Sequence, residues 1–140
     1  MASNSDIQMV TFLLEQEEYA VDVMAVREII NMRDVTKVAN SPCHVEGVID
    51  LRGTIVPVIS LRKRFGLPQT NDSDGLLNCI AVMDFAGTLT GFVIDEVSDV
   101  IRISQSEILP PLDTGNQPWI EGILNLDRRL IIVMNLKLLA

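Results

Sequence analysis

The chain has 140 residues, of which 48% are hydrophobic, and a formal net charge of −8 at pH 7. This length suits one domain or two small units with a shared core, and no apolar run approaches the roughly 20 residues that span a bilayer. An acidic surface repels nucleic-acid phosphates and anionic lipids, and Met1–Asp6 is too short and polar for a signal peptide. We therefore expect a cytoplasmic protein without nucleic-acid binding or membrane insertion.

The first third of the chain predicts a hairpin followed by a helix. Alternating apolar residues favour two strands, Gln8–Leu14 and Glu18–Val21. Asp22 can cap a helix, and apolar residues at helical spacing predict a short one over Val23–Asn31. A short strand is predicted at Val35–Val38.

The centre of the chain predicts a second hairpin with an arginine at its tip. Two apolar runs, Val45–Leu51 and Ile55–Leu61, are joined by Arg52-Gly53-Thr54, where glycine accepts the positive φ of a short turn. Pro57 cannot donate to a sheet ladder, so it favours a sheet edge or a bulge. The basic cluster Arg62-Lys63-Arg64 is interpreted as a solvated strand end.

The second half predicts further strands after one candidate linker. Pro68–Gly75 is rich in Pro, Asn, Asp, Ser and Gly, which is typical of a linker. The remaining predicted elements are a hairpin of Leu76–Phe85 and Leu89–Ile94, a turn and strand at Asp95–Ile103, an irregular segment at Ile108–Gly115, and strands at Trp119–Leu126 and Leu130–Leu136.

The central hairpin is repeated near the C-terminus. Val45–Leu61 matches Ile120–Leu136 at a constant shift of 75 residues (120 − 45), and the pairs include Val58 with Val133. A fainter match links Val26–Ile29 to Val97–Val100. The repeat predicts an all-β fold made of two copies of one small unit, approximately 8–67 and 76–140 with the linker at 68–75, and leaves open an exchange of strands between them. The tips differ, because Arg52-Gly53 corresponds to Asp127-Arg128.

No pattern in the chain predicts catalysis, a metal or a cofactor. The single histidine, His44, follows Cys43 on an extended segment, where neighbouring side chains point to opposite faces. Cys43 and Cys79 are far apart in a chain without a secretion signal, which indicates two buried, reduced thiols. Four aspartates suit caps, turns and exposed strand positions better than a converging set of ligands: Asp22, Asp50, Asp95 and Asp99.

Five segments, in this order, resemble the CheW-like family of bacterial chemotaxis coupling proteins. Short apolar runs are common, but the ordered set around LRGTIVPVI is specific and covers nearly the whole chain. The segments are VTFLLEQEEYAVDVMAVREII at Val10–Ile30, GVIDLRGTIVPVISLRKRFGL at Gly47–Leu67, GFVIDEVSDVIRI at Gly91–Ile103, ILPPLD at Ile108–Asp113 and WIEGILNLDRRLIIVMNL at Trp119–Leu136.

The resemblance implies two packed five-stranded SH3-like barrels with one or two short helices. It also implies a non-enzymatic adaptor that joins the cytoplasmic tip of transmembrane chemoreceptors to the regulatory domain of the histidine kinase CheA. The receptor-facing groove between the barrels would include Val26, Glu28, Gly47, Arg52, Gly91, Val97 and Val100. A kinase-binding barrel edge is placed at Ile55, Val56 and Pro57.

Each of these residues also has a purely structural interpretation. The valines suit core positions, the glycines suit bulges, Glu28 suits a solvated surface, and Arg52 suits a solubilising turn. The chain also departs from the family pattern at Asp50, at Ser60 and in the first turn near Glu15, which bears on the geometry of the Arg52 hairpin. The alternatives are a homologue that serves another kinase array, such as twitching motility, a small β-barrel enzyme or ligand carrier, and a nucleic-acid binder.

Overall fold

The computed structural model describes residues 6–14, 17–66, 79–110 and 118–139. These residues form two five-stranded sheets, so the predicted all-β fold is confirmed. The chain divides into two compact units, which we call unit 1 (Met1–Met24 with Val97–Ala140) and unit 2 (Ala25–Glu96). No helix in the described part of the chain is long and apolar enough to cross a membrane.

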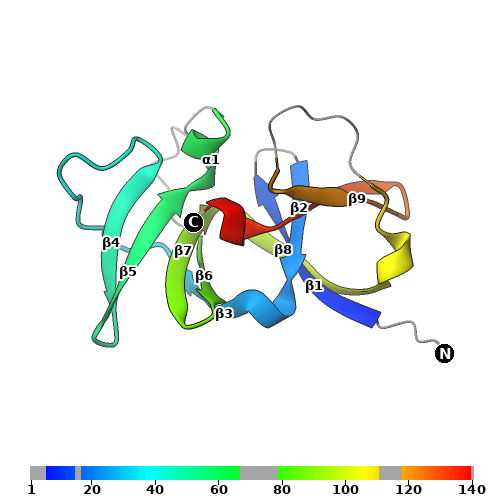
Figure 1. The fold of residues 1–140 in the computed structure, drawn as a ribbon, viewed down its shortest axis with the longest axis horizontal. Helices are drawn as coiled ribbons and strands as arrows, with labels where there is room; N and C mark the ends of the chain where they lie inside the picture. The colour runs from blue at the N-terminus through cyan, green and yellow to red at the C-terminus, as the bar shows by residue number, and fades with distance from the viewer. Residues whose placement is uncertain (1–5, 15–16, 67–78, 111–117, 140) are drawn as a thin grey trace. The chain divides into compact units, whose positions relative to one another are not determined.

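Unit 2 is a sheet in the order β3-β6-β7-β5-β4, coloured from blue to yellow-green in Figure 1. Two antiparallel hairpins, β4–β5 and β6–β7, join through a parallel pairing of β5 with β7. The elements are β3 Val26–Asn31, β4 Val45–Leu51, β5 Thr54–Ser60, the one-turn helix α1 Leu61–Arg64, β6 Cys79–Phe85 and β7 Thr88–Ile94.

Unit 1 repeats this arrangement with strands from both ends of the chain. Its order is β8-β1-β2-β10-β9, so blue strands lie beside yellow and orange strands in Figure 1. The hairpins β1–β2 and β9–β10 join through parallel pairing of β2 with β10. The elements are β1 Asp6–Leu14, β2 Glu17–Asp22, η1 Val23–Ala25, β8 Glu96–Ser104, η2 Gln105–Glu107, β9 Ile120–Leu126, β10 Arg129–Met134 and η3 Leu136–Leu139.

The 75-residue repeat corresponds to equivalent core positions in the two units. In unit 2 the buried cluster includes Ile49, Val56 and Val58. In unit 1 the residues 75 positions later, Leu124, Ile131 and Val133, belong to the equivalent cluster. Full burial of one such side chain stabilises a fold by about 1.5–3 kcal/mol. The apolar residues that match between the two copies therefore include core residues of both units.

The compact units do not coincide with the two halves of the repeat. Strands β1 and β2 lie in the first half of the chain but share a sheet with β8, β9 and β10 from the second half. A duplicated unit allows this exchange, because each copy offers the same pairing edge. The expected linker at 68–75 lies outside the described residues.

The predicted helix over Val23–Asn31 is wrong. Asp22 does act as a cap, since its Oδ1 accepts a hydrogen bond of 2.9 Å from the N–H of Met24, but only the 3-10 turn η1 follows. The rest is β3, which pairs with β6 and alternates between half-buried and exposed positions. A helix this short does not persist alone, and the β-branched residues Val26, Ile29 and Ile30 suit a strand.

Three smaller expectations also need correction. Val35–Val38 forms only an isolated bridge, between Thr36 and Val48. The basic cluster is helix α1, where Arg62 is buried and paired with Asp95 rather than solvated. Cys43 is exposed and Cys79 is half-buried, although both thiols are free.

Pro57 was expected at a sheet edge or bulge, but β5 is an inner strand. The parallel pairing with β7 covers only Val58–Ser60, so Pro57 lies just before it. Opposite β4, Pro57 faces Val48, three pairs from the closing pair Leu51–Thr54. Hydrogen-bonded and non-bonded pairs alternate in an antiparallel ladder, so no N–H is required of Pro57 there.

Candidate protein-interaction site

Arg52 lies at the tip of the β4–β5 hairpin, as the sequence predicted. Arg52 and Gly53 have φ of 51° and 90°, which is the positive pair that a type I′ turn requires. Asp50 fastens the turn, since its Oδ1 accepts a hydrogen bond of 2.8 Å from the N–H of Gly53. The Arg52 side chain is 67% exposed, so the turn presents a guanidinium group to solvent.

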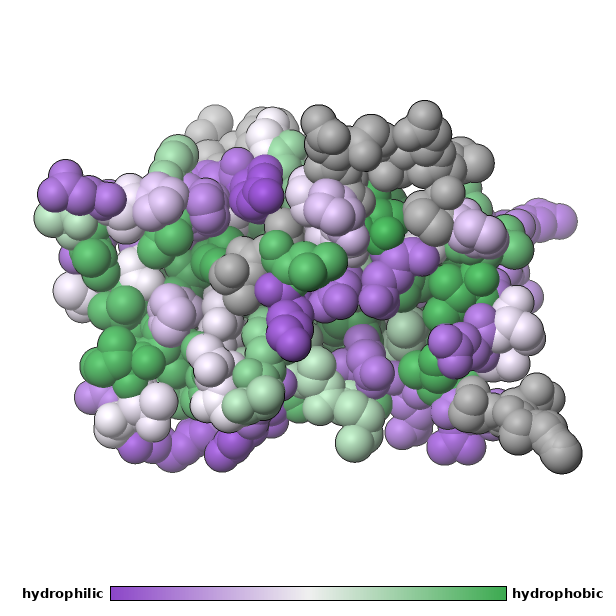
Figure 2. Space-filling view, in the orientation of Figure 1, coloured by the Kyte–Doolittle hydropathy of each residue, from purple (hydrophilic) through white to green (hydrophobic). Residues whose placement is uncertain are grey.

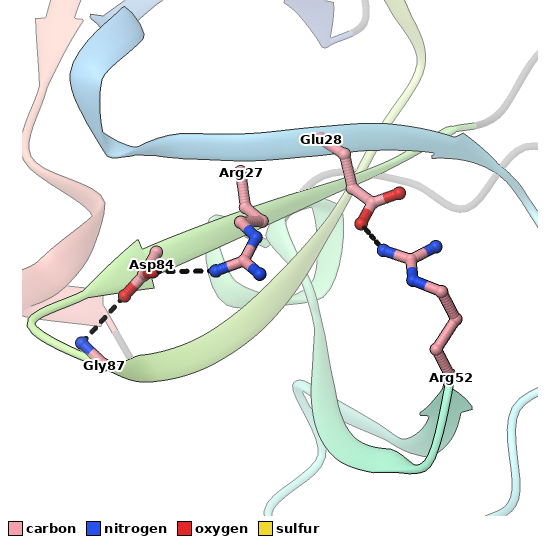
Figure 3. A network of polar contacts seen from close by, with 5 residues as sticks. All are labelled: Arg27, Glu28, Arg52, Asp84 and Gly87. Atoms are coloured by element: carbon pink, nitrogen blue, oxygen red, sulfur yellow. Dashed lines mark hydrogen bonds and ion pairs between the residues drawn. The ribbon is translucent and has the colours of Figure 1, made fainter.

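Glu28 on β3 holds the Arg52 side chain. A hydrogen-bonded ion pair joins Arg52 Nη2 to Glu28 Oε2, and Figure 3 shows the two side chains reaching toward each other from the hairpin tip and from β3. Two residues that the resemblance placed in one site are therefore in contact within unit 2. An arginine has five N–H donors, so further donors of Arg52 face solvent.

A second ion pair lies beside the first and was missed by sequence analysis. Arg27 Nη1 donates a hydrogen bond of 3.3 Å to Asp84 Oδ2 on β6 (Figure 3). Asp84 Oδ1 also accepts a hydrogen bond of 2.8 Å from the N–H of Gly87 in the β6–β7 turn. The helix predicted over this segment concealed the pair. No local signal could have found the pair, because Asp84 comes from the distant strand β6 and Arg27 lies at a register shift of β3.

Gly47 and Gly91 are buried and allow close packing rather than exposing a contact surface. A Cβ on Gly47 would come within 2.1 Å of the carbonyl oxygen of Thr36. Gly47 has a φ of 145° and lies where the pairing of β4 with β5 shifts register. A Cβ on Gly91 would come within 2.8 Å of Ile80 Cγ2. The structural interpretation of both glycines therefore holds, whatever partner binds nearby.

The three candidate valines differ in exposure and fall in different units. Val26 begins β3 in unit 2 and is half-buried. Val97 and Val100 lie on β8 in unit 1, where Val97 is half-buried and Val100 is 55% exposed. Val100 is thus available to a partner, contrary to the core position that periodicity favoured.

The suggested kinase edge divides by alternation along β5. Ile55 is 62% exposed and Pro57 is exposed, whereas Val56 is completely buried in the unit 2 core. Figure 2 shows hydrophobic surface over the region of β4 and β5, at the left of the view. Leu130, at the position of unit 1 that corresponds to Ile55, is likewise 67% exposed.

Charged groups in unit 1 form a structural pair rather than a reactive one. Arg129 on β10 binds both carboxylate oxygens of Glu18 on β2, and its Nε lies 3.1 Å from Oε1. These hydrogen bonds hold the pKa of Glu18 below its usual value, although burial opposes the shift. Burial raises the pKa of the Cys79 thiol. Within the described ranges, no three His, Cys, Asp or Glu side chains are grouped to hold a metal ion.

Comparisons with known proteins show what the chain is similar to. The family model described as CheW-like domain matches residues 8–140. The chemotaxis protein CheW of Treponema pallidum is 33% identical over 142 residues, which covers 97% of this chain and 84% of that protein. The chemotaxis protein CheW of Bacillus subtilis is 36% identical over 131 residues, which covers 91% of this chain and 83% of that protein.

A solved structure shows the same fold. The crystal structure of the scaffolding protein TtCheW from Thermoanaerobacter tengcongensis matches with a TM-score of 0.85 and 33% identity, and covers 96% of this chain and 87% of that chain. The family match spans nearly the whole sequence and includes both five-stranded sheets except for the first two residues of β1. The chain therefore belongs to the CheW-like family of chemotaxis scaffolding proteins.

Proposed function

We propose that this protein is a cytoplasmic, non-enzymatic adaptor that couples transmembrane chemoreceptors to the histidine kinase CheA. The observation that carries the proposal is the exposed guanidinium of Arg52, which Glu28 holds at the tip of a tight turn in a CheW-like chain. A preorganised arginine presents a planar set of donors, which suits the carboxylate and carbonyl groups of a partner protein.

Each unit carries candidate receptor contacts. In unit 2, the contacts would be Arg52 at the tip of the β4–β5 hairpin and Val26 and Glu28 on β3. In unit 1, Val97 and Val100 on β8 would add apolar contact. Gly47 and Gly91 would act indirectly, by keeping β4 and β7 close to their neighbours.

The kinase contact would use the exposed side of β5. Ile55 and Pro57 point away from the core, so the kinase regulatory domain could cover them. Val56 is removed from this proposed contact because it is fully buried. An exposed branched residue beside a proline gives an apolar surface with little flexibility to lose on binding.

Arg52→Ala tests the receptor contact. The variant should keep its stability within a few tenths of a kcal/mol, because an exposed turn side chain contributes little to folding. It should weaken binding to a soluble chemoreceptor fragment containing the cytoplasmic hairpin tip about tenfold, measured by isothermal titration calorimetry. Undiminished affinity would show that Arg52 is not part of the receptor site.

Ile55→Asp tests the kinase contact separately. The substitution places a charge on an exposed position, so the fold should remain intact while binding to the CheA regulatory domain falls. Leu130→Asp is the matched control, since Leu130 occupies the corresponding position of unit 1 with similar exposure. Equal loss of kinase binding in both variants would contradict a contact specific to β5.

A pull-down from the native cell would identify the kinase array that the protein serves.

A further inference from the structure

Arg27 and Arg52 present two guanidinium groups on the same unit, each held by a single carboxylate. Arg27 is 57% exposed and Arg52 is 67% exposed. The partner of Arg52 is Glu28, which directly follows Arg27 on β3. Consecutive Cα atoms lie 3.8 Å apart, so the two ion pairs originate at neighbouring points of one strand. In Figure 3 both guanidinium groups lie on the same side of the β3 ribbon.

The local backbone explains why Arg27 joins this side. The pairing of β3 with β6 shifts register between Val26 and Glu28, which leaves Arg27 as the extra residue of a bulge. Bulges redirect side chains that a regular strand would send to alternate faces. Asp84 is fixed in turn, because its other oxygen is engaged by the N–H of Gly87.

These two ion pairs should contribute little to the stability of the fold. Exposed ion pairs contribute little to folding, because solvent screens the charges and the side chains lose freedom. Both guanidinium groups keep N–H donors that face solvent, and arginine carries no acceptor. A partner that uses those donors must therefore supply oxygen acceptors, and carboxylates give the strongest hydrogen bonds to guanidinium groups.

We propose that Arg27 is a second partner-contacting residue beside Arg52, and that the two together select a receptor segment carrying a pair of acidic side chains. This inference rests on the proposed function, because it deepens the receptor site on unit 2. Asp84 pairs with Arg27 in the free protein and would compete with a partner carboxylate for it in the complex. The pair would thus set which receptors are bound most tightly.

The experiment compares four variants by calorimetric titration with the same soluble chemoreceptor fragment. Arg27→Gln should raise Kd about fivefold and flatten its dependence on ionic strength, because one charge contact is lost. Asp84→Asn keeps an oxygen that can accept from Gly87 but removes the competing charge, so affinity should stay the same or increase. Arg33→Gln removes an equal charge from another exposed position of unit 2 and should leave Kd unchanged. Arg52→Ala is the reference for the proposed receptor site.

The outcomes separate this inference from the proposed function. A loss with Arg27→Gln, without a loss with Asp84→Asn, supports a partner contact at Arg27. Equal losses with Arg27→Gln and Asp84→Asn would mean that the ion pair is only structural and would overturn the inference. Unchanged binding with Arg27→Gln while Arg52→Ala binds weakly would also overturn it, and would leave the proposed function standing. Unchanged binding with Arg52→Ala would instead remove the receptor site itself.

Discussion

Two side chains of β5 have opposite environments. Val58 is completely buried in the unit 2 core, whereas Ile55, three residues earlier, is 62% exposed. An unpaired carboxylate in an apolar core costs several kcal/mol, so Val58→Asp should abolish the folded state. The same substitution at Ile55 should change stability by no more than about 0.5 kcal/mol. Urea denaturation followed by circular dichroism checks both, and similar midpoints for the two variants would contradict the burial of Val58.

The carboxylate of Glu18 should make unit 1 sensitive to acid. Its pKa is lowered in the folded state, first by the hydrogen bonds from Arg129 and also by side-chain hydrogen bonds from Thr11 and Ser98. The ionised group therefore stabilises the fold above the ordinary pKa of 4.5, and this contribution is lost as the pH falls through the lower folded value.

Glu18→Gln tests this dependence. The variant should be less stable than the natural protein at pH 7, and the difference should shrink as the pH falls from 4.5 through the lowered folded pKa of Glu18, because the carboxylate then becomes protonated. Thermal unfolding measured across this pH range gives the comparison. As a control, Glu121→Gln removes a carboxylate from an exposed position on β9 and should have little effect on thermal stability at pH 7 or at low pH. A Glu18→Gln deficit that persists at low pH would place the contribution of Glu18 in packing rather than charge.

The hairpin turns show how one element tolerates different sequences. Among the residues that the structure describes, three two-residue turns have positive φ at both central positions, and two of them place glycine second: Arg52-Gly53 and Ala86-Gly87. The third has Asp127 at φ 50° and Arg128 at φ 70°. A residue with a side chain in this left-handed region destabilises the fold by about 1–2 kcal/mol. Glycine avoids this strain, but it loses more backbone entropy on folding, which offsets part of the gain.

Arg128→Gly should therefore stabilise the protein by about 0.5–1 kcal/mol. The gain should appear as a higher urea midpoint with an unchanged slope. Arg128→Ala is the control, because it removes the same side chain but keeps a Cβ in the left-handed conformation. If both variants had the same midpoint, the backbone of Arg128 would not be strained, and any change would come from the lost charge.

At the scale of elements, the hairpins could be predicted from the sequence, whereas strand β3 could not. The β4–β5 and β6–β7 hairpins have local signals, since the turn and both strands are adjacent in the chain. Strand β3 has no such signal, because its partner β6 lies far along the sequence and its pattern of Val26, Ile29 and Ile30 also fits a helix. The tertiary pairing decides between the two.

The same limit applies to the candidate site. Arg52 could be placed at a tip because the turn is local, and the exposure of Ile55 against Val56 follows from alternation once the strand is assigned. The partners of Arg27 and Arg62 could not be predicted, because Asp84 and Asp95 come from distant strands. The structure contributes long-range pairs of side chains that no spacing in the sequence encodes.

For the whole molecule, the exchange of strands couples the two units through the chain itself. Unit 1 closes only when β2 pairs with β10, and the residues between them include all of unit 2. When unit 2 is folded, its compact structure holds its two ends at a fixed separation. If unit 2 unfolded first, unit 1 would have to close a flexible loop of about 70 residues, at an entropic cost of about 4 kcal/mol. That cost is a large part of the 5–15 kcal/mol typical of a domain.

Unit 1 should therefore never outlast unit 2 during unfolding. Trp119, the single tryptophan, reports on unit 1 by fluorescence, and the half-buried thiol of Cys79 reports on unit 2 by its reaction with a thiol reagent. The raised pKa of Cys79 keeps this reaction slow while unit 2 is folded. The measurement uses a Cys43→Ser background, because Cys43 is exposed and would react at every denaturant concentration. In a guanidinium titration, the Trp119 transition should occur at the same concentration as Cys79 labelling or at a lower one. Native Trp119 fluorescence in molecules whose Cys79 is already labelled would show that unit 1 closes without the help of unit 2.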